Sequence, residues 1–100
     1  MIQKLILGDC LEKMADIPDK NVDCVICDLP YGSTQNSWDI IIPFDELWKQ
    51  YDRVCKDNAA IILFAAQPFT TDLINSNRKN FRYDLVWNKN VPTGMSQAKY

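Results

Sequence analysis

The chain has 100 residues, of which 47% are hydrophobic and 24% are charged, a composition that fits one small folded domain and excludes an intrinsically disordered chain. Its net charge of −2 at pH 7 provides no overall basic surface for nucleic acid. The apolar runs fall well short of the roughly 20 residues that a membrane-spanning helix needs, and the N-terminus lacks the shape of a signal peptide. We therefore expect a cytoplasmic protein with no membrane partner.

The first third of the chain alternates apolar runs with one helical pattern. Residues 4–7 (K-L-I-L) have the composition of a short strand, and residues 11–17 carry apolar side chains at helical spacing. Asp9 is placed to cap that helix, with Glu12 as its capping-box partner three residues on. Residues 22–27 (V-D-C-V-I-C) are almost entirely apolar, which is typical of a buried strand in a parallel sheet.

The rest of the chain continues this alternation after a long loop at residues 28–42. Apolar residues then recur every three to four positions, which is the spacing of an amphipathic helix. Farther on, one run is wholly apolar and another alternates apolar with polar residues, as strands do. In chain order we expect a helix at 43–56 that begins near Pro43, a turn at Asp57-Asn58, a strand at 59–66, a shorter helix from Pro68 and a strand at 81–87.

Strands separated by helices predict an α/β fold with a parallel sheet and right-handed crossovers. Such sheets bind ligands just beyond the carboxyl ends of their strands. The predicted strand ends carry polar and aromatic residues, so we expect the functional site at this rim, with Trp87 in the core and Lys89 near the rim. The four strand ends are Gly8-Asp9, Asp28-Leu29-Pro30-Tyr31, Ala66-Gln67-Pro68-Phe69 and Trp87-Asn88-Lys89.

Cys24 and Cys27 form a C-x-x-C pair within the second predicted strand. Side chains three residues apart in a strand point to opposite faces of the sheet, so the two thiols are poorly placed to bind one ion. The chain has no histidine that would complete a zinc site. We therefore expect both cysteines to be buried as small apolar side chains.

The stretch D-L-P-Y follows the second predicted strand and combines three kinds of group. Pro30 fixes its own φ and restricts Leu29 to extended conformations, so the Leu29 carbonyl has a defined direction. The Asp28 carboxylate is a second acceptor close by, and two neighbouring acceptors match the two hydrogens of an NH₂ group. Tyr31 offers a flat surface for a planar ring. The stretch predicts a site for an aromatic amine, with an ordinary strand-to-turn transition as the alternative.

D-L-P-Y resembles the D-P-P-Y motif of amino-directed DNA methyltransferases, which act on adenine N6 or cytosine N4. The resemblance covers about residues 4–95 and implies a Rossmann-like methyltransferase fold, S-adenosylmethionine as cofactor and double-stranded DNA with a flipped base as partner. The other segments similar to this family are G-D-C-L-E-K-M, I-P-D-K-N-V-D-C-V-I-C, Leu47-Trp48, Arg53-Val54, I-I-L-F and F-R-Y-D-L-V-W-N-K.

The resemblance also implies roles for the residues of the motif. In the family, the acid and the following main-chain carbonyl accept the hydrogens of the target amine, which assigns these roles to Asp28 and to the Leu29 carbonyl. Pro30 is the retained proline of the motif, and Tyr31 would stack on the flipped base. Leu29 stands where the family usually has its first proline. An acid at the first position favours adenine N6 over cytosine N4, which stays as the alternative.

Other residues are assigned to the cofactor by the same resemblance. Asp9 would accept a hydrogen bond from the amino group of the cofactor's adenine, and the Cys10 N–H would meet a ring nitrogen, although Asp9 is also a plausible helix cap. Phe69 would line the cofactor pocket or pack in the core. Trp38 and Asp39, in the long loop, are candidates to close the site, with solvated loop residues as the alternative.

The glycine-rich turn that holds the methionine part of the cofactor in this family is missing from these residues. The chain has three glycines and no G-x-G. We therefore expect residues 1–100 to form the N-terminal catalytic part of one methyltransferase domain in permuted order, inactive alone, with the glycine-rich loop and a target-recognition region beyond residue 100. A non-catalytic α/β binding module is the alternative reading of the whole chain.

Overall fold

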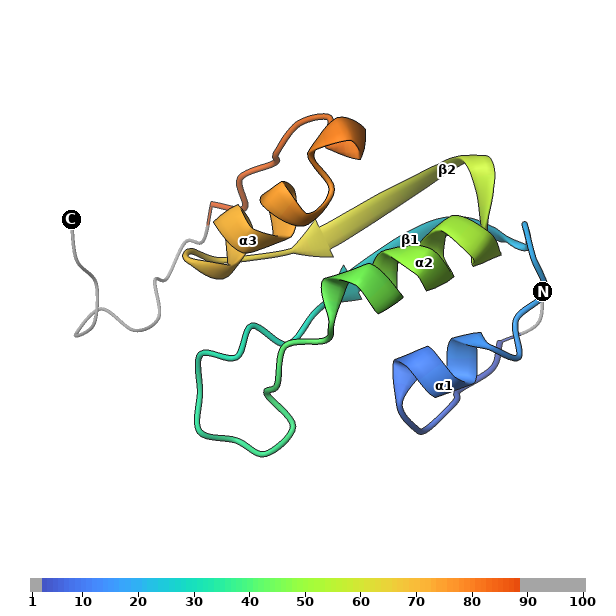
Figure 1. Ribbon diagram of the computed structural model, residues 1–100, viewed down its shortest axis with the longest axis horizontal. Coiled ribbons are helices and arrows are strands. Elements are labelled where there is room, and N and C mark those ends of the chain that lie inside the picture. The colour runs from blue at the N-terminus through green and yellow to red at the C-terminus, as the bar shows by residue number, and fades with distance from the viewer. Residues whose placement is uncertain (1–2, 89–100) are drawn as a thin grey trace.

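Two neighbouring parallel strands form a small sheet, with α-helices beside it (Figure 1). The computed structural model describes residues 3–88. Within this range, no helix is long and apolar enough to cross a membrane. The elements are α1 (Cys10–Met14), β1 (Val22–Asp28), α2 (Phe44–Val54), β2 (Cys55–Phe64), α3 (Phe69–Ser76) and the 3-10 helix η1 (Arg78–Asn80).

The predicted parallel pairing is confirmed for β1 and β2. Cys24 lies opposite Ala60, and the register continues without interruption to Asp28 opposite Phe64. Helix α2 connects the two strands, as expected for a parallel pair, which cannot be joined by a tight hairpin. The fold is therefore a small α/β arrangement whose two strands end at the same edge of the sheet.

The start of β2 differs from the prediction. The strand begins at Cys55, directly after α2, and Val22 lies opposite this cysteine. Residues 56–59 of β2 then correspond to a single residue of β1 before the regular register resumes. The predicted turn at residues 57–58 is wrong as a boundary between elements, because both residues belong to this irregular stretch.

Helices α2 and α3 cover one face of the sheet and form the core with it. Leu47 and Tyr51 of α2 pack against Phe69 and Leu73 of α3, and Leu29 joins them from the end of β1. Half-buried residues of both strands pack on this cluster from one face of the sheet, as the period of two in a strand requires. They are Val25, Cys27, Ile61 and Leu63.

The opposite face of the sheet is open in the described part of the chain. Ile26 is 69% exposed there, and Ile62 and Phe64 are also exposed. The expectation of a strand buried on both faces is therefore wrong for β1. Cys24 is exposed and Cys27 is half-buried, so the expectation of two buried thiols is wrong as well. The described residues contain no group of His, Cys, Asp and Glu that could hold a metal ion.

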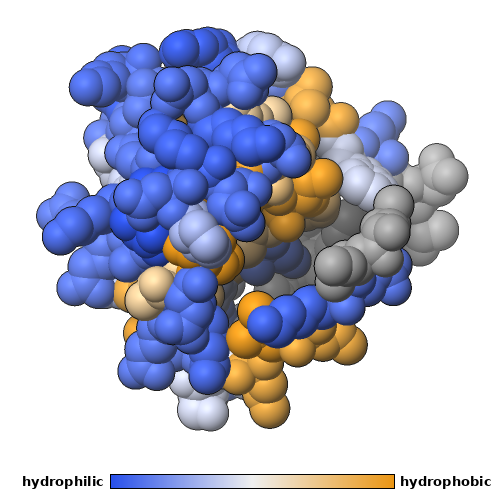
Figure 2. All heavy atoms as spheres, turned by 90° about the vertical axis from the view of Figure 1, so that its right-hand side faces the viewer, coloured by the Kyte–Doolittle hydropathy of each residue, from blue (hydrophilic) through white to orange (hydrophobic). Residues whose placement is uncertain are grey.

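Two predicted strands, at residues 4–7 and 81–87, are wrong, because neither segment forms regular structure. A strand needs a neighbour for its main-chain N–H and C=O groups, and within residues 3–88 β1 and β2 pair only with each other. The apolar side chains of both segments are exposed. Figure 2 shows that hydrophobic side chains also reach the surface on the side of the molecule that faces right in Figure 1.

Trp87 was expected in the core and is 77% exposed instead. Its ring lies near that of Phe64, with 6.1 Å between the centroids. Because Phe64 belongs to the open face of the sheet, Trp87 lies against that face. The reason is the missing strand at residues 81–87, which would have carried Trp87 into a packed layer. Lys89 lies outside the described residues.

Helix α1 begins where the sequence predicts. The Asp9 carboxylate accepts a hydrogen bond from the Leu11 N–H at 2.9 Å and so caps the helix. Glu12 forms no reciprocal bond to the Asp9 N–H among the described hydrogen bonds, so the capping box is not formed. The helix ends at Met14, three residues earlier than the predicted end at Ile17.

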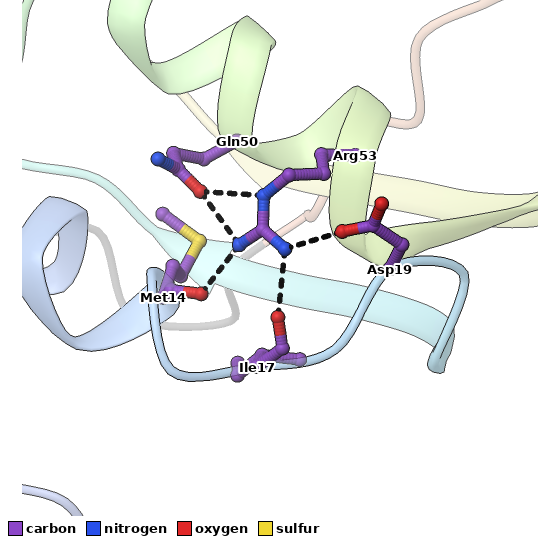
Figure 3. Close-up of polar contacts among 5 residues, drawn as sticks. All are labelled: Met14, Ile17, Asp19, Gln50 and Arg53. Carbon is purple, nitrogen blue, oxygen red and sulfur yellow. Dashed lines mark hydrogen bonds and ion pairs between the residues drawn. The ribbon is translucent and has the colours of Figure 1, made fainter.

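Arg53 of α2 holds the end of α1 in place (Figure 3). Its guanidinium donates to the main-chain oxygens of Met14 at 2.7 Å and Ile17 at 2.8 Å, and to the Asp19 carboxylate at 2.8 Å. Gln50, one turn earlier on α2, accepts two further bonds from the same group. The last carbonyls of a helix lack intrahelical partners. The arginine supplies hydrogen-bond donors to carbonyls at this end and so ties α1 to α2.

We predict that Arg53→Ala lowers the free energy of unfolding by about 2 kcal/mol, because charge-assisted bonds to two half-buried carbonyls are lost. Lys49→Ala is the matched control, since Lys49 is an exposed cation on the same helix. Urea denaturation followed by circular dichroism measures both variants. Equal effects of the two substitutions would show that the guanidinium contacts contribute nothing specific.

Candidate functional site

The D-L-P-Y stretch lies at the carboxyl edge of the sheet, as predicted. Asp28 is the last residue of β1, and the loop that leads to α2 begins immediately after it. This stretch and the loop enclose a cavity of about 320 Å³, which we call the motif cavity and which is at the lower end of the range for small-molecule sites. Its lining residues are Asp28, Leu29, Pro30, Tyr31, Ser33, Thr34, Trp38 and Asp39.

Both residues that carry the predicted acceptors, Asp28 and Leu29, line this cavity. The Asp28 side chain is exposed, and one of its oxygens accepts a hydrogen bond from the Tyr31 hydroxyl at 2.9 Å. Leu29 as a whole residue is only 5% exposed and belongs to the core, and none of the loop and turn hydrogen bonds of the described residues is accepted by its main-chain carbonyl. Core packing therefore fixes position 29, and the Asp28 carboxylate lies exposed directly before it.

Tyr31 is held on one side by the core. Its ring stacks on that of Phe69, with 5.1 Å between centroids and an interplanar angle of 26°. Phe69 is 3% exposed and is the first residue of α3. Burial, and next the hydrogen bond to Asp28, raise the pKa of Tyr31 to about 12, so near neutral pH its hydroxyl stays a donor to the carboxylate.

The beginning of the loop is folded around the Asp39 carboxylate, which is buried. One oxygen accepts from the Gly32 N–H at 2.9 Å, and the other from the Thr34 N–H and the Thr34 hydroxyl, both at 2.7 Å. The Thr34 hydroxyl and then the Gly32 N–H lower the pKa of Asp39 below its ordinary value. Gly32 has φ +70, and a Cβ there would lie 2.8 Å from the Ile41 side chain, so this position requires glycine.

A second cavity of about 320 Å³ adjoins the first, and Tyr31 lines both. It opens between the loop and the start of α3. Phe69, one of the predicted cofactor residues, lies in its wall. The remaining lining residues are Gly32, Ser33, Ile41, Ala66, Gln67, Pro68 and Asp72.

Asp9 and Cys10, the other two predicted cofactor residues, line neither cavity. Asp9 caps α1, and Cys10 is the first residue of that helix. Partial burial of its thiol, followed by the charges of Asp9 and Cys27, raises the pKa of Cys10. Helix α1 therefore contributes these two residues to neither cavity.

Sequence reasoning missed four polar residues in the cavity walls. Ser33 and Thr34 line the motif cavity, and Gln67 and Asp72 line the second one. The only signal for Thr34 was its position between Gly32 and Asp39 in a polar loop. Asp72 lies at the start of the helix predicted from Pro68, and nothing in the sequence distinguishes it from a solvated helix residue.

Comparison of the chain with protein-family models and with solved structures finds no match. The functional argument therefore depends on the geometry of the cavity and on the chemistry of its residues.

We predict that the amide protons of Gly32 and Thr34 report the ionisation of Asp39, because both donate to its carboxylate. A lowered pKa means that the ionised carboxylate stabilises the loop fully above the ordinary value of 3.8, and that this stabilisation is lost as the pH falls through the lowered pKa. NMR titration should give a common midpoint below 3.8 for the two amides. A midpoint at or above that value would contradict the hydrogen-bonded arrangement.

Proposed function

We propose that this chain carries the catalytic part of a DNA methyltransferase, which transfers a methyl group from S-adenosylmethionine to N6 of adenine in double-stranded DNA. One observation carries the proposal: the exposed Asp28 carboxylate and the Leu29 residue that follows it line one cavity together with Tyr31, whose hydroxyl bonds to that carboxylate. This set of groups matches an amine on a planar heteroaromatic base. The resemblance of D-L-P-Y to the motif of the amino-directed enzymes supports the same reaction.

The chain's own residues would mainly orient the amine and accept its hydrogens. Asp28 and the Leu29 carbonyl would each accept one N–H, which draws the nitrogen lone pair out of conjugation with the ring. The nitrogen then becomes a nucleophile, and Asp28 is the closest base for the proton that the amine loses. Because Tyr31 occupies one carboxylate oxygen, the other oxygen is the one available to the amine. Correct placement of the reacting atoms supplies much of the rate enhancement.

The adenine must leave the DNA duplex to reach these groups, since a stacked base cannot enter a cavity. Tyr31 would then contact the base with the ring surface that Phe69 does not cover. The cavity of about 320 Å³ has room for one base. Leu29, in place of the usual proline, keeps the carbonyl in position through its buried side chain.

S-adenosylmethionine would supply an electrophilic methyl group when bound. The second cavity, which shares Tyr31 with the first, is the place where the described residues fit the cofactor, with Phe69 as an apolar wall and Gln67 and Asp72 as polar groups. Asp9 and Cys10 fit only in part, because they line neither cavity. We propose that the glycine-rich loop of the cofactor site lies outside the described residues, in a Rossmann-like fold whose further helices would cover the open face of β1 and β2.

The direct test is to express the complete reading frame, methylate unmodified DNA and identify the product by mass spectrometry of its nucleosides. We predict N6-methyladenine, because an acid at position 28 favours adenine. N4-methylcytosine would overturn the choice of base and keep the reaction class. Absence of any methylated base would favour a non-catalytic binding module.

We predict that Asp28→Ala in the same protein lowers methyl transfer by about 10²- to 10⁴-fold, the usual contribution of a positioned acid or base. A tritiated-methyl assay measures the rate, and calorimetry should find cofactor affinity unchanged. Asp23→Ala is the matched control, because Asp23 is an exposed acid of the same strand outside both cavities. Near-normal turnover of Asp28→Ala would remove the basis of the proposal.

A further inference from the structure

Trp38 is the least explained residue of the motif cavity. It is 70% exposed although it is a large aromatic residue, and it lines the cavity together with Asp28 and Tyr31. The proposed binding of the amine by Asp28 and Leu29 does not involve Trp38, and the core cluster does not include it. An exposed indole in the same cavity as Asp28 and Leu29 provides a flat apolar surface for a planar ligand.

The loop holds the main chain next to Trp38 in place. Its neighbour Asp39 is 7% exposed and accepts three hydrogen bonds from Gly32 and Thr34. The Asp39 N–H also donates to the Asn36 carbonyl at 3.0 Å. These bonds close residues 32–39 into a ring that begins directly after Tyr31. The main chain beside Trp38 is part of this ring.

We infer that Trp38 is a second base-contacting residue of the proposed site, and that Asp39 is the positioning residue that holds it there. The inference rests on the proposed function and deepens it. The flipped base lies against the indole with its amine at Asp28 and Leu29, while Tyr31 contacts the same base from the motif itself. An additional aromatic surface favours the larger ring system of a purine, which agrees with adenine as the substrate.

The test uses the protein of the complete reading frame and steady-state kinetics with DNA. Trp38→Ala should lower kcat/KM for DNA by roughly 5- to 150-fold, the loss expected for one base–aromatic contact, with cofactor affinity unchanged. Trp38→Phe keeps an aromatic ring and should recover most of this loss. Ile40→Ala is the control, because Ile40 is equally exposed, lies two positions on and lines neither cavity.

Asp39→Asn distinguishes a positioning role from a merely structural one. The amide leaves a single acceptor oxygen for the three donors, so kcat/KM should fall by about the same factor as in Trp38→Ala. In the Trp38→Ala background, Asp39→Asn should cost nothing further, since both changes remove the same contact. An equal cost in both backgrounds would overturn the positioning role.

Tryptophan fluorescence gives an independent readout. DNA that contains the target should quench the emission of the unsubstituted protein, and Trp38→Phe should lose most of this quenching. If Trp38→Ala keeps kcat/KM within twofold, the inference is wrong while the proposed function stands. If the unsubstituted protein methylates no DNA, the proposed function fails, and the inference fails with it.

Discussion

Burial of the Leu29 side chain is the constraint on which the site depends. This side chain packs in the core with Leu47 of α2 and Phe69 of α3, and it therefore fixes the main chain at the point where β1 ends. Because neighbouring residues of extended chain point in opposite directions, burial of Leu29 leaves Asp28 exposed at the rim. The same anchoring holds the main chain of Leu29 in place directly after the carboxylate.

The core also determines where the aromatic surfaces lie. Phe69 is both a core residue and the support of the Tyr31 ring, so the packing of α3 on the sheet sets the position of the tyrosine. Tyr31 and Ser33 line both cavities, which are of similar size. A reaction between two bound molecules needs such neighbouring sites, and the arrangement gives the proposed methyl transfer a place for each partner.

Local signals in the sequence predicted the parts of the fold that depend on local interactions. The apolar spacing of α2 and the apolar runs of β1 and β2 correspond to these elements, although β2 starts earlier than predicted. The segments at 4–7 and 81–87 have the composition of strands and form none, because strand formation depends on a pairing neighbour, which periodicity does not reveal. The exposure of Cys24 has the same origin, since burial of the second face of a sheet depends on other layers.

The site was predictable where one short stretch contains the chemistry. Asp28, Leu29, Pro30 and Tyr31 lie together in one cavity wall, as expected. The role of Asp39 could not be predicted, because its bonds to Gly32 and Thr34 depend on how the loop closes. Asp9 and Cys10 were assigned by resemblance alone, and in the described residues their helix stays outside the cavities.

The central claim is that the Asp28 carboxylate and the Leu29 carbonyl together bind an aromatic amine. The most direct measurement is an NMR titration of the protein with adenosine and with purine riboside, which has the same ring system without the amino group. The account predicts that adenosine shifts the Leu29 and Tyr31 amide resonances and binds about tenfold or more tightly than purine riboside, because the two acceptors stay unpaired without the amine. Equal affinities, or shifts that leave these two residues unchanged, would contradict it.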